Sequence, residues 1–375
     1  MHAVIVNPAP PAASKGTERT LTAVGERLHS LGHRVTYVWN SSFKGEILGV
    51  AAAPHFECIS VPFLQLGPFY HLKLRRVLPS RADAIYLSNA VQFPILPIVG
   101  VPTILGFHTF GPERSHFGRS TSVGSTAVSR VALRLWVEAV SRRSPVVAHV
   151  ENETQKTWLV ESGLGRLETL VIPPPLDCQT VRPMPELWNT RTKFTVLFLG
   201  GLGERKGIHL YLEIARRFQS EVGGAAQFLI VGDGPERATV TQAVASSEYL
   251  QYCGVVTDDQ KVQLYNSCHV LVSPSLEENY HCVSAESQLC GLPVISSDLS
   301  GPREIIKPGE TGLLVPSGSV DAFVSALRPM WKKWTWARSD YIDNRKRIAE
   351  RASGWCLEGR AERLAELFLR FEPNR

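Results

Sequence analysis

Two glutamates separated by seven residues, Glu278 and Glu286, have the types and spacing that most specifically suggest chemistry in this 375-residue chain. They lie in the run PSLEENYHCVSAE, between a predicted buried strand and a predicted helix at Val283–Leu289. This places Glu278 in a loop and Glu286 about one turn inside the helix. Amides at a helix N-terminus bind phosphate oxygens or hydroxyls, so we expect the amides of residues 280–283 to do so. Glu286 can accept a hydrogen bond from a ribose diol.

A second candidate is His108, which directly follows the predicted strand Thr103–Phe107. Ligands of parallel α/β sheets bind at the carboxyl ends of the strands. His108 is therefore expected to face a binding cleft, although its position alone leaves a structural role open.

Short apolar runs alternate with amphipathic stretches along the whole chain, which predicts parallel sheets covered by helices on both faces. The predicted strands are Ala3–Val6, Val35–Trp39, Cys58–Val61, Ala84–Leu87, Thr103–Phe107, Val146–Val150, Leu170–Ile172, Phe194–Leu199, Phe228–Val231, Leu250–Cys253, Val270–Val272 and Val294–Ile295. A proline-rich segment, residues 173–185, cannot continue a strand or helix and is interpreted as a linker. We therefore predict an α/β chain with a first domain at residues 1–180 and a second at 181–352.

Composition and missing motifs exclude several classes of protein. With 44% hydrophobic and 20% charged residues, the chain is typical of folded soluble proteins. The first strand is not followed by Gly-x-Gly-x-x-Gly, and no Gly-x-x-x-x-Gly-Lys-Ser/Thr occurs, which argues against a dinucleotide-dependent dehydrogenase and a phosphate-loop enzyme. Seven widely spaced cysteines argue against a disulfide scaffold or structural zinc. Without a signal peptide or an apolar stretch of bilayer length, we expect a cytoplasmic protein.

The net charge of +5 lies in the first half of the chain, where residues 1–180 hold 17 Lys and Arg against 12 Asp and Glu. Six arginines lie within residues 114–143, and the segment Val128–Arg143 reads as a basic amphipathic helix. One interpretation is peripheral contact with an anionic membrane surface. The other is an ordinary solvated helix face. We expect no nucleic-acid partner.

The glutamate run resembles the Glu-x7-Glu motif of the retaining GT-B glycosyltransferases, specifically glycosyltransferase family 4 (group 1). Further matching segments follow in the family's order and cover nearly the whole chain. They are Lys15-Gly16-Thr17-Glu18, Gly32-His33-Arg34-Val35, Ile172-Pro173 with Leu176-Asp177, Gly200-Gly201-Leu202 with Lys206-Gly207, Gly232-Asp233-Gly234-Pro235, and Glu304 with Gly309 to Val315.

This resemblance implies the GT-B arrangement, in which two doubly wound Rossmann-like domains face each other across a cleft. Residues 1–180 would bind the acceptor, residues 181–352 would bind the donor, and the helix within 353–375 would pack back on the N-terminal domain. The implied activity is transfer of a sugar from a nucleotide-sugar donor to a saccharide or lipid-linked acceptor, with retention of anomeric configuration. The resemblance also implies catalysis without a metal or other cofactor, and the chain has no Asp-x-Asp motif.

Matching positions imply roles for single residues. Lys206 would neutralise the departing diphosphate, Glu278 would contact hydroxyls of the transferred sugar, Glu286 would hold the ribose, and His108 would contact the donor sugar near the reacting carbon. The nucleotide base would rest beside Gly254 and Val255. The other donor-binding candidates lie in the loops around these residues: Lys15, Gly16, Gly201, Arg205, Gly232, Asn279, Tyr280, His281, Cys282 and Val283.

Three departures from the family pattern leave alternatives open. Gly201 stands where the family has an arginine, so Lys15 or Arg205 would have to replace that charge on the diphosphate. Asn279 replaces a usual glycine. His281 replaces another, and its side chain either narrows the sugar site or lies outside it. Two rival functions are a nucleotide-sugar epimerase and a catalytically weak nucleotide-sugar-binding subunit, which a donor hydrolysis assay separates from a transferase.

Overall fold

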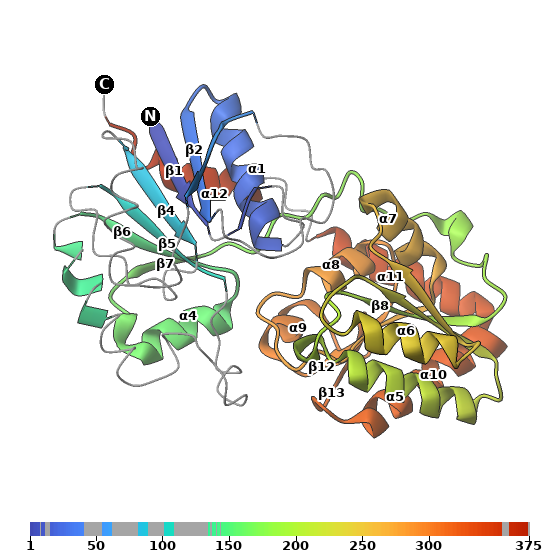
Figure 1. Ribbon diagram of the computed structural model, residues 1–375. Coiled ribbons are helices and arrows are strands. Elements are labelled where there is room, and N and C mark those ends of the chain that lie inside the picture. The colour runs from blue at the N-terminus through green and yellow to red at the C-terminus, as the bar shows by residue number, and fades with distance from the viewer. Residues whose placement is uncertain are drawn as a thin grey trace. The chain divides into compact units, whose positions relative to one another are not determined.

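The chain folds into two compact units, each built on one parallel β-sheet (Figure 1). The computed structural model describes residues 1–7, 9–11, 16–40, 55–61, 82–88, 101–108, 134–135, 137–139, 141–142, 144–354 and 360–373. One unit is Met1–Pro175 with Glu358–Arg375, and the other is Leu176–Leu357. The division between Pro175 and Leu176 lies inside the proline-rich segment. The prediction of two doubly wound α/β domains is confirmed.

The first sheet has the strand order β3-β2-β1-β4-β5-β6-β7, with every neighbouring pair parallel. Its strands are β1 (His2–Val6), β2 (Arg34–Asn40), β3 (Glu57–Val61), β4 (Ala84–Ser88), β5 (Thr103–Phe107), β6 (Val146–Val150) and β7 (Glu168–Val171). Every residue of β1, β4, β5 and β6 is buried. Continuous burial explains why these runs are apolar without alternation, because both faces of the sheet are covered.

The described helices of this unit are α1 (Gly16–Ser30), α4 (Glu153–Leu159) and α12 (Arg360–Leu369). In α1 the buried residues Leu21, Val24 and Leu28 recur at helical spacing and join one hydrophobic core with Leu364 and Phe368 of α12. The C-terminal helix therefore completes the first unit although nearly 200 residues of the second unit intervene.

The second sheet has the strand order β10-β9-β8-β11-β12-β13 and is also parallel. Its strands are β8 (Phe194–Leu199), β9 (Ala226–Val231), β10 (Leu250–Gly254), β11 (Val270–Ser273), β12 (Val294–Ser297) and β13 (Gly312–Val315). Its helices are α5 (Ile208–Glu221), α6 (Arg237–Ala245), α7 (Asp258–Ser267), α8 (Cys282–Leu289), α9 (Ser300–Ile305), α10 (Val320–Trp336) and α11 (Arg338–Ser353). The order reverses between β8 and β11, which are neighbours in the sheet.

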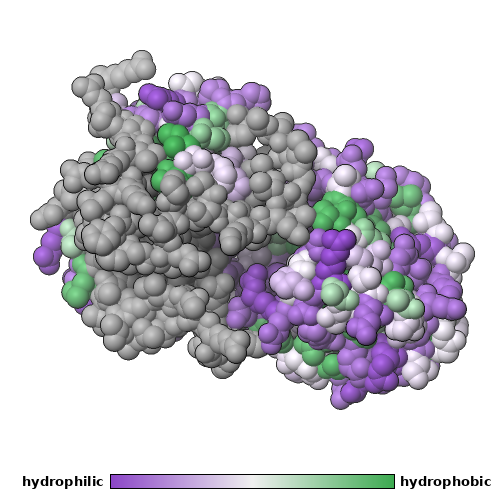
Figure 2. All heavy atoms as spheres, in the orientation of Figure 1, coloured by the Kyte–Doolittle hydropathy of each residue, from purple (hydrophilic) through white to green (hydrophobic). Residues whose placement is uncertain are grey.

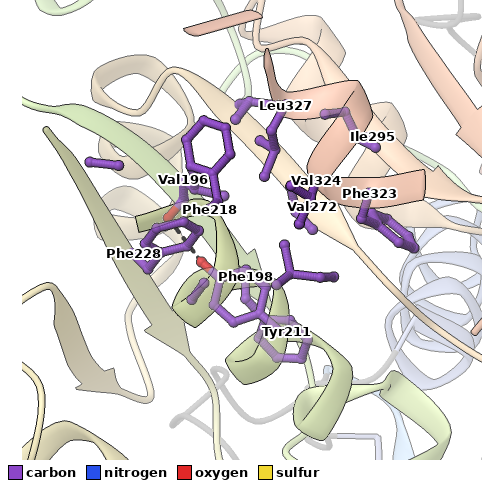
Figure 3. Close-up of a cluster of buried hydrophobic side chains, with 14 of the residues drawn as sticks. Val196, Phe198, Tyr211, Phe218, Phe228, Val272, Ile295, Phe323, Val324 and Leu327 are labelled. Carbon is purple, nitrogen blue, oxygen red and sulfur yellow. Dashed lines mark hydrogen bonds between the residues drawn. The ribbon is translucent and has the colours of Figure 1, made fainter. Parts of the chain in front are cut away.

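Aromatic side chains fill the core between this sheet, α5 and α10 (Figure 3). Phe228 of β9 is fully buried and makes edge contacts with Tyr211 and Phe218 of α5. The Tyr211 hydroxyl donates to the carbonyls of Val196 and Leu229, both at 3.0 Å. This buried hydroxyl is thus satisfied by the sheet itself, as a buried polar group requires.

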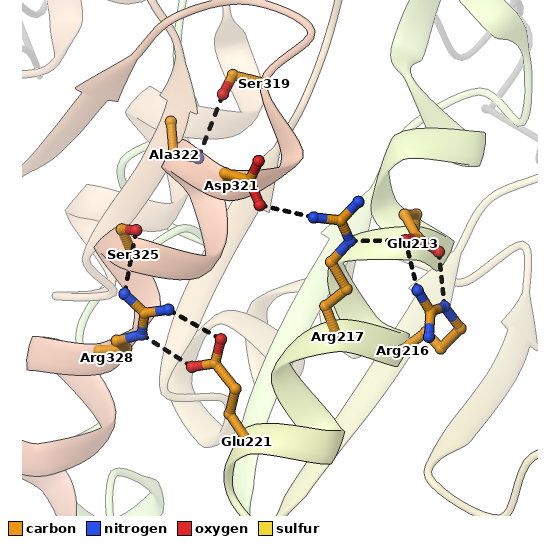
Figure 4. Close-up of polar contacts among 9 residues, drawn as sticks. All are labelled: Glu213, Arg216, Arg217, Glu221, Ser319, Asp321, Ala322, Ser325 and Arg328. Atoms are coloured by element: carbon orange, nitrogen blue, oxygen red, sulfur yellow. Dashed lines mark hydrogen bonds and ion pairs between the residues drawn. The ribbon is translucent and has the colours of Figure 1, made fainter.

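Ion pairs also join α5 to α10, on the surface above this core (Figure 4). Arg328 of α10 donates two hydrogen bonds of 2.8 Å to Glu221. Arg217 of α5 lies between Glu213 and Asp321. These side chains are largely exposed, so water and salt weaken the pairs and the apolar core dominates stability.

A buried arginine, Arg345 of α11, holds the C-terminal ends of α7 and α8. Its guanidinium donates to five carbonyl groups, those of Tyr265, Asn266, Cys268, Cys290 and Gly291, at 2.9–3.3 Å. A cation is favourable at a helix C-terminus, where carbonyls lack partners within the helix. Arg345 thereby fixes the two helices that carry Lys261 and Glu286.

Two surface properties bear on the sequence predictions. In Figure 2, apolar residues are scattered among hydrophilic ones on the visible face of the second unit. None of the helices in the described ranges is long and apolar enough to cross a bilayer.

The cysteine spacing argued against a disulfide scaffold; Cys178 nevertheless forms a disulfide bond. Among the described cysteines, Cys58, Cys253, Cys268, Cys282 and Cys290 are free thiols.

We predict that Phe228→Ala lowers the free energy of unfolding by about 3–5 kcal/mol, because it removes a fully buried ring and leaves a cavity. Arg328→Ala is the matched surface control in the same α5–α10 contact and should have a much smaller effect. Urea unfolding followed by tryptophan fluorescence measures both. Equal losses would show that the surface ion pair stabilises the unit as much as the buried ring does.

Candidate functional site

The polar side chains that could bind a ligand or take part in a reaction lie near the ends of strands in the two sheets. In the second unit the loops after β8 and β11 carry Lys206 and Glu278, and these strands flank the reversal of strand order. Open α/β sheets bind ligands at that position, because the loops there diverge and leave backbone and side chains free to face a ligand.

Lys206 and Glu278 form an ion pair in which the Lys206 ammonium donates to Glu278 Oε1. The Ser275 hydroxyl donates to the same oxygen at 2.9 Å. The two loops are also joined through their backbones, because the Leu276 amide donates to the Arg205 carbonyl at 2.9 Å. Gly207 permits this approach: its φ is +70°, and a Cβ there would overlap the Pro274 carbonyl.

The Glu278 side chain is almost fully buried and nevertheless ionised. Burial by itself would raise its pKa, but the charge of Lys206, followed by those of His281 and Arg205, lowers the pKa to about 2. Arg205 is exposed and lies in the short 3-10 turn Glu204–Lys206. The loop thus concentrates two positive side chains around one buried carboxylate.

His281 lies inside the second unit, beneath Glu278. Its Nε2 is 2.9 Å from the Ser273 hydroxyl and 3.6 Å from Glu278 Oε1, and its Nδ1 is 2.5 Å from the Ser284 hydroxyl. Burial lowers the pKa of His281 to about 4, so the ring is neutral at pH 7. The ring thus contacts Ser273, Ser284 and Glu278 from inside the unit, and its effect on the sugar site stays a prediction.

Glu286 lies on α8, one turn from its start, and both of its carboxylate oxygens already have donors. Lys261 of α7 donates to Oε1 at 3.0 Å, and the Tyr265 hydroxyl donates to Oε2 at 2.8 Å. A carboxylate has about four acceptor sites, so capacity remains for a diol. Lys261 and Tyr265 could not be found from the sequence, because their helix carries no recognisable motif.

The predicted donor-binding glycines lie at neighbouring strand ends. Gly232 follows β9, and its amide donates to the carbonyl of Gly254, the last residue of β10, at 2.8 Å. Val255, next along the chain, is 45% exposed. A Cβ at Gly201 would meet little, its nearest neighbour being the Asp233 carbonyl at 3.9 Å. The structure therefore has room for a Cβ at this position, where the family carries an arginine.

Helix α8 begins at Cys282, one residue before the predicted start, with His281 at the N-cap. The Cys282 amide donates to the Tyr280 carbonyl at 3.2 Å, so this amide is engaged locally. Asn279 contacts the following helix: a Cβ on Gly301 of α9 would overlap its carbonyl. Val283 is half-buried in the first turn of α8.

In the first unit His108 follows β5, as predicted, and its side chain is buried. Its Nδ1 is 2.9 Å from Glu151 Oε1, and its Nε2 is 2.7 Å from the Tyr86 hydroxyl. That hydroxyl is also 2.6 Å from Nδ1 of His149. The sequence did not reveal these three partners, because they come from β4 and β6 and meet His108 only in the folded sheet.

Other predicted positions fall at or beyond the limits of the described chain. Lys15 lies outside the described residues, and Gly16 is the first residue of α1. Most of the basic segment 114–143 is also outside them; within it, Arg134 pairs with Glu138 at 3.0 Å and Val137 packs in the core. No group of three or more His, Cys, Asp or Glu in the described part of the chain could hold a metal ion.

Comparisons with protein families agree with this geometry. Residues 14–180 match the model of glycosyltransferase family 4, and residues 193–333 match that of glycosyl transferases group 1. A phosphatidyl-myo-inositol mannosyltransferase of Mycobacterium leprae is 30% identical over 276 residues, which cover 72% of this chain and 69% of the relative. A GDP-mannose-dependent alpha-mannosyltransferase of Mycobacterium tuberculosis is 28% identical over 325 residues, which cover 82% of this chain and 81% of the relative.

Solved structures share the fold. A sucrose-phosphate synthase from Thermosynechococcus elongatus superposes with a TM-score of 0.77 at 19% identity, covering 98% of both chains. HepE from Anabaena, in complex with UDP and glucose, gives a TM-score of 0.74 at 16% identity over 99% of this chain and 100% of its own.

The buried Glu278 carboxylate predicts a specific acid sensitivity. Its folded pKa of about 2 lies below the ordinary 4.5, so the stabilisation is present above pH 4.5 and lost as pH falls toward 2. Between about pH 6 and about pH 3 the wild type should lose about 2 kcal/mol more unfolding free energy than Glu278→Gln, which lacks this titration. Unfolding curves at both pH values measure the difference. Equal acid sensitivity would mean that the carboxylate is not held ionised.

Proposed function

This chain belongs to the family 4 glycosyltransferases of group 1, and from that premise we propose that it transfers a sugar from a nucleotide-sugar donor to an acceptor hydroxyl. The observation that supports this most is the Lys206–Glu278 pair beside the point where the strand order reverses, with Glu286 on the following helix. It combines a cation for a diphosphate with two carboxylates for hydroxyl groups.

Donor binding in this proposal exchanges the partner of Lys206. The ammonium moves from Glu278 to the diphosphate, where it offsets the charge that grows as the phosphate departs. Glu278 is then free to accept hydrogen bonds from hydroxyls of the transferred sugar. Lys261 and Tyr265 hold Glu286 in place, so its carboxylate meets the ribose diol already oriented.

The charge missing at Gly201 can be supplied by Arg205. Arg205 lies next to Lys206 in the same turn, and its charge already acts on Glu278. Lys15, the other candidate, lies outside the described residues and remains a proposal. Because Cβ of residue 201 would face open space, a variant with arginine there should fold.

We further propose retention of configuration without a metal ion. In this proposal Glu278 accepts from hydroxyls of the transferred sugar, and Glu286 is held by two donors, so neither is assigned as a covalent nucleophile. Front-face attack, in which the departing phosphate accepts the acceptor's proton, needs no such group. His108 keeps its proposed contact with the transferred sugar, the role implied by family membership.

The relatives' names indicate which substrates to assay first. Two of them are mannosyltransferases, one named for GDP-mannose and one for phosphatidyl-myo-inositol, so GDP-mannose with an inositol lipid is the first pair, followed by UDP-glucose with saccharide acceptors. Release of nucleoside diphosphate that depends on an acceptor supports transfer. Donor binding without turnover would instead favour the binding-subunit alternative, and release of a sugar epimer would favour an epimerase.

We predict that Lys206→Ala lowers kcat about 100- to 1,000-fold, because the departing diphosphate loses its principal cation. Arg205→Ala, one residue away in the same turn, should lower kcat less, because the Arg205 side chain is exposed and acts on Glu278 only through its charge. Steady-state release of the nucleoside diphosphate measures both. A fully active Lys206→Ala enzyme would show that the diphosphate binds elsewhere.

We predict that Glu286→Ala weakens donor binding by about 1.5–3 kcal/mol, the value of a hydrogen bond to a charged group. Calorimetric titration with the donor's nucleoside diphosphate measures this, since the ribose is retained and the sugar is absent. Glu221→Ala, an exposed glutamate on α5, is the matched control and should bind as the wild type does. Unchanged affinity in Glu286→Ala would remove the ribose assignment.

A further inference from the structure

Four buried side chains of the first unit form a continuous hydrogen-bonded cluster, here called the Tyr86 cluster: Tyr86, His108, His149 and Glu151. The contacts run in one line from Glu151 Oε1 to His108, Tyr86 and His149, and end at the Ile172 carbonyl. Their lengths are 2.9, 2.7, 2.6 and 2.8 Å in that order. All four are within hydrogen-bonding distance.

Each of these four contacts needs one hydrogen between its two heavy atoms. In their ordinary states at pH 7, each neutral histidine carries one hydrogen on its ring nitrogens and the tyrosine carries one on its hydroxyl oxygen. The ionised glutamate carries none on its carboxylate. That supplies three hydrogens for four contacts. The count is the same whichever direction the donors point along the line.

We propose that the Tyr86 cluster holds one proton more than its groups carry in their ordinary states, and that Tyr86, His149 and Glu151 are positioning residues that keep a hydrogen on Nε2 of His108. The cluster as a whole is then electrically neutral, because the extra proton offsets the Glu151 carboxylate. A neutral cluster is also the one that burial favours, since an uncompensated buried charge is costly.

The far end of the line fixes the direction of the donors. The Ile172 carbonyl can only accept, so His149 donates from Nε2. Burial, followed by the charge of His108, lowers the pKa of His149 to about 3, so its Nδ1 carries no hydrogen and accepts from Tyr86. Burial also raises the pKa of Tyr86 well above its ordinary value, which keeps that hydroxyl protonated. The Tyr86 oxygen must then accept from His108 Nε2.

The extra proton therefore lies at the other end, between His108 Nδ1 and the Glu151 carboxyl. Either an imidazolium faces a carboxylate, or a neutral ring faces a carboxylic acid; both satisfy the count. The Glu151 backbone is fixed in turn, because its amide donates to Gln155 of α4 at 2.7 Å. Tyr37 is the other titratable group that acts on Tyr86.

The backbone and the neighbouring helix are shaped around this line. Gly106 lies beside Tyr86 and His108, and a Cβ there would overlap the Tyr86 hydroxyl and approach His108 Nε2. On the other side, the ring of Phe368 in α12 stacks on Tyr86 with ring centres 6.1 Å apart. The cluster thus depends on a glycine at one position and on the C-terminal helix at another.

The hydrogen bonds of His108 limit its role in catalysis. This conclusion rests on the proposed sugar transfer. With Nε2 donating to Tyr86 and Nδ1 facing Glu151, neither ring nitrogen can take a proton from an acceptor hydroxyl. His108 then acts as a fixed ring, and not as a general base. This agrees with a reaction in which the departing phosphate accepts that proton.

The test is NMR of the full chain labelled with nitrogen-15 at histidine, with His108→Gln and His149→Gln used only to assign resonances. At neutral pH we expect a protonated Nε2 on both rings and an unprotonated Nδ1 on His149. Tyr86→Phe removes the acceptor, so Nε2 of His108 should lose its hydrogen while the ring keeps its contact with Glu151. An unprotonated Nε2 on wild-type His108 would overturn the proposal, whether or not the chain proves to be a transferase.

Activity supplies the second readout. Tyr86→Phe should lower kcat about 10- to 100-fold by displacing the His108 ring, with KM for the donor within about 2-fold. Tyr341→Phe is the matched control, since it removes another buried hydroxyl, one that donates to the His269 carbonyl at 2.8 Å. In Gly106→Ala the added Cβ pushes the Tyr86 hydroxyl away from His108 Nε2 without removing a titratable group. This variant should therefore lower kcat as Tyr86→Phe does. Equal kcat losses in Tyr86→Phe and Tyr341→Phe would reduce the cluster to a structural role.

Discussion

A buried carboxylate must have a cation beside it, and in this protein that requirement organises the second unit around Glu278. Burial disfavours the charged form, yet the positive charges of Lys206 and Arg205 keep the side chain ionised at neutral pH. To bring Lys206 close enough, the loops after β8 and β11 have to meet, which Gly207 allows by removing a Cβ from the Pro274 carbonyl. In the proposed transfer this ion pair is exchanged: the diphosphate takes over Lys206, and hydroxyls of the transferred sugar donate to Glu278 in its place.

The parallel sheets determine which residues can cooperate. All strand carboxyl ends of one sheet share an edge, so residues far apart in sequence become neighbours there. Lys206 and Glu278 are 72 residues apart, and His108 and Glu151 are 43 apart. In the second sheet the cluster comes from the loops after β8 and β11, and in the first it combines residues within β4 and β6 with those that directly follow β5 and β6. In the second unit Arg345 adds a further link, since it fixes the ends of the helices that carry Lys261 and Glu286.

Much of the fold could be predicted from the sequence, because buried parallel strands are short apolar runs that stand out between amphipathic helices. The twelve predicted strands each overlap an observed one, and the Glu278 loop and Glu286 helix lie where their motif placed them. The two glutamates of this motif are close in sequence, so their spacing is enough to predict that one lies in the loop and the other in the helix. Helix starts were less predictable: α8 begins at Cys282, one residue before the predicted start at Val283.

The partners of these residues could not be predicted. Lys261, Tyr265, Tyr86, His149 and Glu151 belong to ordinary-looking helices and strands, and only the strand order brings them to the motif residues. The position of the His281 ring was equally hidden, since a loop histidine can turn inward or outward. It turns inward because Ser273 and Ser284 offer it hydrogen bonds.

The proposed exchange, in which a donor diphosphate takes Lys206 from Glu278, can be seen in a crystal structure of the protein with bound GDP or UDP. We expect Lys206 Nζ within hydrogen-bonding distance of a phosphate oxygen, Glu278 released from it, and the ribose hydroxyls on Glu286. A nucleotide bound with the Lys206–Glu278 pair intact, or with its phosphates away from the loops after β8 and β11, would rule this exchange out.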